Sequence, residues 1–584
     1  MSMLILATQT ASARAGQSLA LAQASAAAQG FGGPQRFDWA GGAAWLYPTP
    51  AQATGSGCAV RLGQRFAVSV GAFHWRGLGS TAALTRLLQR DDAVEAWPWD
   101  QISGAYCMLL GRDDGVWLVG DALGLMKVYE VEGGGLISTS MLACCAALDR
   151  VAVASSLQAQ QYVLLGASHG LQTAIAGIRL VDPTGARNLV SGQAIKLHAP
   201  QRLLGRAGRG GPTSPAEAVA AVSAEITAEF TQLRQAHGPN IGMALSGGFD
   251  SRLLLAALDG IGVRPDLFVY GRPQDDDVAV AVGLAERLGL PMDALDKARA
   301  GRDLAPLNPA KIESNLHFFD GLPVDGVFDR GCDQATRLKQ VQAGRLNLNG
   351  GGGEILRNFF YLPGGAYTAV DLFSVFYAGW LDSVFLAPEQ RQAFVASVQD
   401  EILAVLGREG GSPQARRQPL QRAEVELVYT LFRLRYWMGC NNSLFARQGA
   451  FMTPLVTPGL VALAAAVPLA WKEYGRLEAA VITQLSPRVA AGPSSYGFDF
   501  SAGPPWQHRR KTDLTRWRPV GLRRHSYRLQ KALGRLPSPQ ASAEWCEALG
   551  AGPCADWLNP AALTSLDQVN RLMTLQALLA LQRR

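Results

Sequence analysis

Hydrophobic residues in the first 200 positions occur in short runs separated by glycine and aspartate turns. The clearest runs are RFAVSV (65–70), AYCMLL (105–110), VWLVGD (116–121) and MKVYEV (126–131). Apolar runs of this length, bounded by turn residues, predict β-strands. We therefore expect residues 1–200 to form a β-rich region.

The pattern changes after residue 215, where helical periods alternate with short apolar runs. A helical stretch at 216–236 precedes IGMAL (241–245), and a second helix is predicted at 251–258. The run PDLFVY (265–270) then precedes an amphipathic helix at 277–290. Strands that alternate with helices in this way predict a parallel α/β sheet.

Beyond residue 365 the pattern is mainly helical, with AEVELVYTLFRLRYWMG (423–439) as a clear example. The run LVTPGLVALAAAVPLAW (455–471) carries no charge. Its length and its two internal prolines predict a buried helix with a loop, and we expect no membrane span.

A segment rich in glycine and arginine, LLGRAGRGGPTSPAE (203–217), lies between the two patterns. It has no hydrophobic periodicity, so we predict a linker at 201–215 between domains at 1–200 and 216–584. Ser214 is expected to cap the following helix, with Pro215 at its first position.

The composition supports a large globular chain. Hydrophobic residues make up 48% and charged residues 17%, and the formal net charge of +7 is modest for 584 residues. No signal peptide is recognised at the N-terminus, because no basic residue precedes its short apolar stretch. The eight cysteines form no CxxC pair. We therefore expect reduced thiols, a cytoplasmic protein and no zinc site.

The stretch IGMALSGGFDSRLLLAAL (241–258) carries the strongest candidate chemistry. It predicts a strand, a glycine turn and the start of a helix, where backbone N–H groups and the helix dipole bind anions. Ser246 and Ser251 add hydroxyl donors, and Asp250 suits a phosphate site if it holds Mg²⁺. The Walker pattern GxxxxGK[ST] is absent. The alternative is a tight turn with capping serine and aspartate residues.

This stretch resembles the SGGxDS pyrophosphate loop of the asparagine synthetase family. Further similar segments are YGRPQDDDVAVAVGLAERLGLP (270–291), LNLNGGGGEILRNFF (346–360) and NNSLFARQGAFMTPLVTPGLVALAAAVP (441–468). In the last of these, Ser443, Ala446, Arg447, Phe451 and Pro454 match a family motif in order. The resemblance implies an ATP-dependent enzyme that adenylates a carboxylate, releases pyrophosphate and lets an amine attack the acyl-AMP.

The segment ISGAYCMLLGRDDGVWLVGDALGLMKVYEVEGGGLISTSMLACCAAL (102–148) resembles the family's glutamine amidotransferase domain. The implied fold is α/β: an N-terminal αββα sandwich, then an ATP-pyrophosphatase-type parallel α/β domain with helical C-terminal additions. Members that hydrolyse glutamine use Cys at position 2, and this chain has Ser2. A hydroxyl without a strong base is a far weaker nucleophile than a thiol. We therefore expect no glutaminase activity.

The resemblance also assigns site residues. The ATP-binding set is Leu245, Ser246, Gly247, Gly248, Asp250, Ser251, Tyr270, Gly351 and Gly352, with Asp250 on Mg²⁺. Glu354, which matches the last residue of the family's second glycine loop, is expected to be catalytic. Asp320, in the turn-rich run HFFDGLPVDGVFDRG (317–331), is a second catalytic candidate, although ordinary Asp-Gly turn chemistry explains it equally well. One of Asp275, Asp276 and Asp277 is expected to cap the next helix, and one of them could lie near the nucleotide.

Two departures concern the amine-handling half of the family's site. Aligned on Glu354, the chain has Gly350 and Gly353 where the family has Glu and Asp. The segment GPSSYGFDF (492–500) occupies the place of the family's catalytic lysine segment and contains no lysine, with Lys472 and Lys511 on either side. This pattern fits a changed second substrate, and it also fits a decayed enzyme.

Three functions therefore stay open. The first is an AMP-forming amide synthetase whose amine does not come from glutamine. Its substrate could be a precursor peptide, processed by a protease and closed as the macrolactam of a lasso-type peptide. The second is an amidation enzyme that uses ammonia in polysaccharide or amino-acid metabolism, and the third is an inactive nucleotide-binding scaffold.

The basic segment WQHRRKTDLTRWRPVGLRRHSYRLQK (506–531) allows several interpretations. It could be a solvated helix pair or a docking surface for an acidic peptide or a phosphorylated partner. Basic residues mixed with Trp and Tyr also occur in nucleic-acid-binding surfaces. No nucleic-acid-binding module accompanies the segment, so we do not expect nucleic acid to be the partner.

Overall fold

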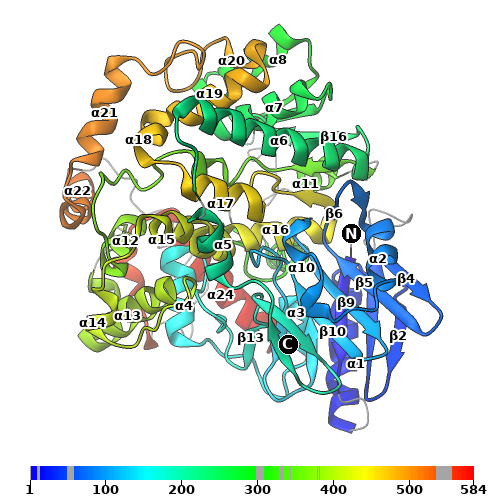
Figure 1. Cartoon of the computed structure of the whole chain (residues 1–584). Helices are drawn as coiled ribbons and strands as arrows, with labels where there is room; N and C mark the ends of the chain where they lie inside the picture. The colour runs from blue at the N-terminus through cyan, green and yellow to red at the C-terminus, as the bar shows by residue number, and fades with distance from the viewer. Residues whose placement is uncertain are drawn as a thin grey trace.

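A computed structural model describes most of the chain. The described residues are 2–8, 13–48, 58–208, 210–296, 308–328, 334–341, 344–377, 379–380, 382–533 and 556–583. Figure 1 shows the N-terminal strands at the lower right and a second region, rich in helices around its own sheet, above and to the left. The mixed α/β fold class predicted from the sequence is confirmed.

Two six-stranded antiparallel sheets form the N-terminal region. The first has the order β13-β11-β12-β1-β3-β2, with bounds β1 (Ser2–Ala7), β2 (Gln35–Trp39), β3 (Gly42–Pro48), β11 (Tyr129–Val131), β12 (Leu136–Ser138) and β13 (Ile178–Leu180). The second has the order β15-β14-β10-β9-β5-β4, with bounds β4 (Cys58–Leu62), β5 (Arg65–Val70), β9 (Cys107–Arg112), β10 (Gly115–Gly120), β14 (Gly185–Asn188) and β15 (Ala194–Lys196).

Alternating side chains of β1 show how these sheets are layered. Leu4 and Leu6 share a core with residues of β5 and β9, so this face of the first sheet packs on the second sheet. Met3 and Ile5 point to the opposite face and pack with α1 (Ala13–Ala28). The outer face of the second sheet packs on α2 (Ser80–Leu88). Because successive side chains of a strand point to opposite faces, the layers follow the order αββα.

A five-stranded parallel sheet forms the centre of the second region. Its order is β18-β17-β16-β19-β20, with bounds β16 (Ile241–Ala244), β17 (Asp266–Tyr270), β18 (Met292–Leu295), β19 (Leu346–Leu348) and β20 (Ala450–Met452). β17 and β18 follow β16 in the chain and lie on one side of it in the sheet, whereas β19 comes later in the chain and lies on the other side. The strand order therefore reverses between β16 and β19, which is where α/β sheets bind ligands at the carboxyl ends of their strands.

The helices of this region agree with most of the predicted ranges. The Ser214 side chain accepts a hydrogen bond from the Glu217 N–H, so the predicted cap of α6 (Pro215–His237) is confirmed. Helices α7 (Phe249–Gly260) and α8 (Asp276–Leu288) follow β16 and β17. The segment predicted as a linker contains α5 (Pro200–Ala207), which packs on α17 (Pro458–Ala466).

The helix predicted at 423–439 has a different form. An α-helix, α15 (Arg422–Val428), continues as a π-helix over Tyr429–Met438 and then as α16 (Gly439–Gln448). The buried ammonium of Lys127, from the N-terminal region, donates to the Arg435 carbonyl at 2.6 Å. Burial lowers the pKa of Lys127 to about 8. The apolar spacing predicted a helix here but did not distinguish an α-helix from a π-helix.

The predicted buried helix in the run 455–471 is confirmed in α17, whereas the short α18 (Leu469–Lys472) that follows Pro468 has only Lys472 buried. Across the described residues, no helix has both the length and the apolar character needed to cross a membrane.

Candidate functional site

The glycine turn lies at the carboxyl end of β16. Ser246 and Ser251 close it: their hydroxyl oxygens are 2.9 Å apart, and the Ser246 N–H donates to Ser251 Oγ at 3.0 Å. Gly248 then occupies the cap position of α7, where no side chain makes a capping hydrogen bond. A helix that begins in this way has orphan N–H groups and a positive dipole end. The turn therefore has the features of an anion-binding site.

A second glycine loop follows β19 and packs directly on the first. A side-chain carbon at position 353 would lie 2.4 Å from Asp250 Oδ1, and one at position 350 would lie 3.1 Å from the backbone of Asp250 and Ser251. Glycine at these positions lets the two loops meet. A side chain at either position would require the facing part of the first loop to shift, so Gly350 and Gly353 suit the close packing of the two loops.

Asp250 lies in a cluster of ionisable groups that spans three segments. Arg357 Nη2 donates to both Asp250 oxygens at 2.7 Å, and Arg357 Nε lies 2.7 Å from Glu478 Oε2. Glu354 accepts a hydrogen bond from the Gly352 N–H at 2.9 Å and another from the Tyr429 hydroxyl. One guanidinium therefore faces several carboxylates.

Burial changes the acidity of these carboxyl groups. Glu478, on α19 (Arg476–Leu485), is completely buried, and its burial raises its pKa well above the ordinary value. Burial also raises the pKa of Asp250 to about 6, against the opposing effect of Arg357. Carboxyl groups perturbed in this way are typical of functional sites in clefts.

The cluster opens into a cavity of about 290 Å³. Its walls are Phe249, Asp250, Glu354, Arg357, Asn358, Phe359, Tyr361, Glu473, Tyr474, Gly475, Tyr496, His508, Thr512 and Arg516. Of the residues predicted from the sequence, Asp250 and Glu354 line it. Aromatic side chains supply much of the wall, and Arg357 and Arg516 lie in it paired with Asp250 and Glu473. A largely aromatic wall suits a planar ligand such as a nucleotide base.

Other predicted residues lie beside this cavity and outside its wall. Gly247 is covered by Ser495 and by the Asp277 carboxylate. Leu245 is buried, with its N–H bonded to the Phe268 carbonyl, so its side chain belongs to the core. Tyr270 ends the neighbouring strand β17 and packs on the ring of Phe268.

Gly351 and Gly352 form the second glycine loop, and φ is +101° at Gly352. Asp275 occupies the cap position of α8, but its carboxylate pairs with Arg272 and makes no capping hydrogen bond.

The segment 492–500 lies against the glycine turn. The Ser495 N–H donates to the Gly247 carbonyl at 3.0 Å. The guanidinium of Arg252 donates to the carbonyls of Gly492 and Pro493. This segment gives the cavity Tyr496 in place of a lysine.

Neither of the lysines that flank this segment in the sequence lies at the cavity. Lys472 is completely buried and pairs with Glu426 at 3.1 Å. Lys511 is exposed on α21 (Trp506–Arg516), and neither residue lines the cavity.

The expectation that Asp320 lines the site is wrong. Its carboxylate accepts hydrogen bonds from Ser140 Oγ at 2.5 Å and from the Met141 N–H at 2.8 Å, at the start of α3 (Met141–Ala146). Arg447 Nη1 lies 3.5 Å from it. Asp320 therefore caps a helix of the N-terminal region from outside that region. Its turn, with φ +54°, directs the carboxylate to this boundary instead of to the sheet edge.

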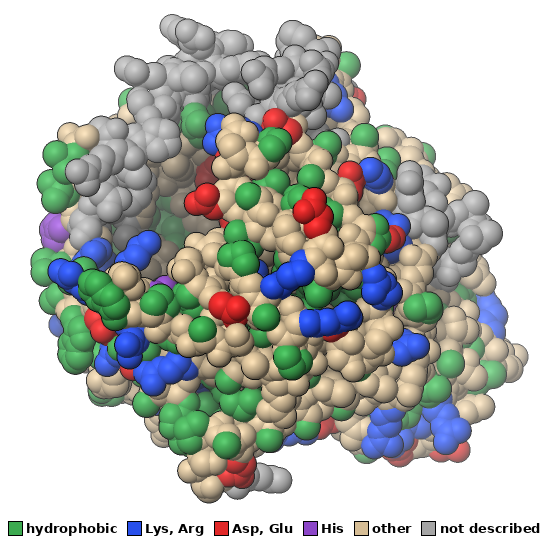
Figure 2. Space-filling model, turned by 90° about the horizontal axis from the view of Figure 1, so that it is seen from above, with side chains coloured by type: hydrophobic (Ala, Val, Ile, Leu, Met, Phe, Trp, Pro, Cys, Tyr) green, Lys and Arg blue, Asp and Glu red, His purple; other side chains and the backbone are tan. Residues whose placement is uncertain are grey.

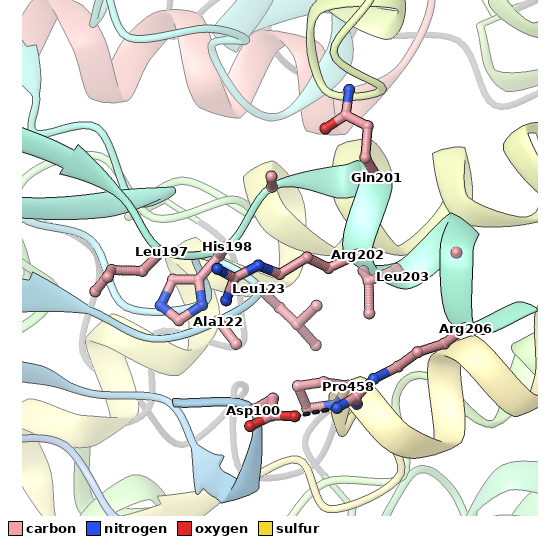
Figure 3. A pocket seen from close by; sticks show the side chains of 12 residues that line it. Asp100, Ala122, Leu123, Leu197, His198, Gln201, Arg202, Leu203, Arg206 and Pro458 are labelled. Carbon is pink, nitrogen blue, oxygen red and sulfur yellow. Dashed lines mark hydrogen bonds and ion pairs between the residues drawn. The ribbon is translucent and has the colours of Figure 1, made fainter. Parts of the chain in front are cut away.

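Another cavity, of about 380 Å³, lies between the N-terminal region, α5 and Pro458. Figure 3 shows the His198 ring beside the Arg202 guanidinium, and an ion pair between Arg206 and Asp100. Burial, and then the charge of Arg202, lower the pKa of His198 to about 4. None of the predicted site residues lines this cavity.

Mg²⁺ is expected at Asp250. Among the described residues, no group of three His, Cys, Asp or Glu side chains is placed to hold a metal ion. Mg²⁺ commonly uses only one or two carboxylates and takes its other ligands from phosphates and water. Asp250, with a partly exposed carboxylate at the cavity wall, fits that type of site when a nucleotide supplies the phosphates.

Sequence reasoning missed Arg357, Glu478 and Tyr496 as site residues. A signal existed for two of them: Arg357 interrupts the apolar run EILRNFF, and Glu478 interrupts the apolar side of RLEAAVITQL. Isolated charges in such runs require a buried partner.

A search with models of known protein families finds no match to this chain, and a search of curated protein sequences finds none either.

Proposed function

We propose that this chain is an ATP-dependent, AMP-forming carbon–nitrogen ligase. It binds Mg·ATP beside the two glycine loops, adenylates a carboxylate and condenses it with an amine that does not come from glutamine. A peptide closed as a macrolactam is one substrate class that fits this activity. The proposal places the enzyme in the cytoplasm.

One observation carries the proposal. The glycine turn 246–251 joins the central strand β16 to a helix start without a side-chain cap, at the point where the strand order reverses. The second glycine loop, Asp250 and Glu354 meet at the same edge of the sheet. Backbone N–H groups and a helix dipole stabilise phosphate charge there, and Asp250 provides an oxygen ligand for Mg²⁺. Arg357 and Arg516 line the same cavity, where each is paired with acidic residues.

The products of ATP test this proposal. We expect AMP and pyrophosphate in equal amounts, because a carboxylate that attacks the α-phosphorus releases pyrophosphate. The measurement is chromatography of radiolabelled ATP products with candidate peptide or amino-acid substrates, and Asp250→Ala serves as the inactive control. Formation of ADP and phosphate by a substrate-dependent reaction would indicate an acyl-phosphate route and overturn the proposal.

Glutamine is not expected to supply the nitrogen. Ser2 is buried at the start of β1, and its Oγ makes no hydrogen bond among the described residues. A serine hydroxyl has almost no alkoxide near neutral pH. We expect wild type and Ser2→Ala to release the same background amount of glutamate from glutamine. Glutamate release that disappears in Ser2→Ala would assign a glutaminase to the N-terminal region.

A second candidate is a nucleotide-binding scaffold without catalysis. The observation that favours it is the cavity itself, whose wall contains no lysine and whose Asp250 is paired with Arg357. Such a protein would bind Mg·ATP without turnover, so the product assay separates it from the ligase.

A further inference from the structure

Helix α21 and helix α22 (Val520–Ala532) form the basic helix pair whose sequence left several interpretations open. They lie at the left edge of the molecule in Figure 1, away from all the sheets. No residue of α21 is buried. The helix is therefore not held by a core of its own, and its exposed side chains need another explanation.

Large hydrophobic side chains project from α21 and its end into solvent. Trp506 is 58% exposed, and Leu514 and Trp517 are each 66% exposed. Single exposed hydrophobic residues are ordinary, but a group of large ones on one short helix marks an interaction surface. Figure 2 shows hydrophobic side chains interspersed with Lys and Arg along the left edge, the side on which α21 and α22 lie.

The charge of this surface is strongly positive. Arg509, Arg510 and Arg518 are exposed, and none of them has an acidic partner among the described residues. The one acid of the segment, Asp513, accepts a hydrogen bond from the Tyr474 hydroxyl at 2.9 Å. The surface therefore has guanidinium groups available for carboxylates of a partner.

These arginines and large hydrophobic side chains line one open hollow of about 950 Å³. Its wall includes Trp506, Leu514 and Trp517 together with Arg509, Arg510 and Arg518. The opposite side of α21, with His508, Thr512 and Arg516 at intervals of one helical turn, lines the Asp250 cavity. α21 thus lies between the two spaces, and Tyr474 borders both.

We propose that the outer face of α21 docks a polypeptide segment rich in acidic and apolar side chains, which carries the carboxylate substrate to the Asp250 cavity. The delivery step rests on the proposed function, whereas the docking does not. Arginines pair with the acidic side chains, and Trp506, Leu514 and Trp517 pack on the apolar ones. A nucleic acid would use the tryptophans for stacking but has no comparable use for Leu514, so a polypeptide fits this surface better.

Fluorescence anisotropy without nucleotide tests the docking. The probe is a short labelled peptide in which glutamates alternate with leucines and phenylalanines; a peptide with lysines in place of the glutamates and a thymidine oligonucleotide are the comparisons. We expect the acidic peptide to bind at least ~10-fold more tightly than the basic one, with affinity that falls as salt rises. Leu514→Ala/Trp517→Ala and Arg510→Glu/Arg518→Glu should each weaken it by about tenfold or more.

The matched control is Leu21→Ala/Arg86→Glu, which changes an exposed leucine and an exposed arginine on helices of the N-terminal region and should bind like wild type. Asp250→Ala should also bind the peptide normally, so loss of ATP binding and loss of docking are distinguishable. Equal affinity for both peptides, unchanged affinity in the surface variants, or preference for the oligonucleotide would overturn the proposal. A wild-type dimer that Trp517→Ala dissociates in sedimentation would also overturn it, because a second copy would then cover this face.

Discussion

Replacing Asp250 with alanine is expected to weaken Mg·ATP binding by at least ~2 kcal/mol and to abolish turnover. The carboxylate that would hold Mg²⁺ is lost, and the ion no longer offsets phosphate charge at this end of the cavity. Calorimetry with a non-hydrolysable ATP analogue and Mg²⁺ measures the affinity. Ser495→Ala is a suitable control, because Ser495 contacts the glycine turn through its backbone N–H. Equal affinities of wild type and Asp250→Ala would contradict the assignment.

Because Asp250 titrates, we also expect Mg·ATP affinity to depend on pH. Since burial raises the pKa of Asp250 to about 6, Mg·ATP affinity should fall as the pH is lowered through that value. The folded state therefore binds the Asp250 proton more tightly than the unfolded chain, in which the pKa of this carboxyl group is 3.8. The contribution of Asp250 to stability is therefore greatest at low pH and is lost as the pH rises through about 6.

ATP also titrates near this pH, so the decisive comparison is with Asp250→Asn, which retains the titration of the nucleotide. If Mg·ATP affinity changes near pH 6 by the same amount in wild type and Asp250→Asn, Asp250 is not the group that titrates.

Replacing Arg357 with methionine is expected to lower the free energy of unfolding by about 3–5 kcal/mol at neutral pH. The change leaves the buried Glu478 and the mostly buried Asp250 without their shared cation. The variant should lose less stability at lower pH, because protonation then removes the uncompensated charges. Urea unfolding at pH 7 and pH 5 provides the measurement.

Two further variants make this test specific. Arg417→Met, on an exposed arginine, should change stability by no more than ~0.5 kcal/mol. The double variant Arg357→Met/Glu478→Gln should recover a large part of the loss, since it removes the buried charge together with its partner. A loss of the same size in both single variants, or no recovery in the double variant, would show that the ion cluster does not account for the stability.

Local pattern predicted much of the site's backbone. The alternation of strand and helix from residue 216 predicted the parallel sheet, and the order Ser, Gly, Gly, Asp, Ser after an apolar strand predicted a glycine turn before a helix. Both are confirmed in β16 and α7. These features depend on residues within a few positions of one another, so the sequence contains the information directly. What binds at the turn stays a prediction.

The chemistry around the turn depended on residues distant in sequence. Arg357 and Glu478 reach Asp250 because β19 and α19 pack beside β16 and α7. Asp320 is the opposite case: the sequence suggested that it lines the site, but packing places it at the start of α3, which it caps. In both cases the side chain's partner was set by packing between elements, which no local spacing reveals.

By itself, therefore, the sequence determined the elements, the parallel sheet and the glycine turn at the end of its central strand. Hydrophobic periodicity and turn chemistry are local, and they indicate most of these strands and helices, although α5 in the predicted linker and the π-helix at Tyr429–Met438 were missed. Only the tertiary structure decided which charges meet at Asp250, how closely Gly350 and Gly353 pack on the first glycine loop, and how α21 lies between a basic hollow and the cavity. These depend on distances across the fold, where burial makes an unpaired charge costly and leaves few arrangements stable.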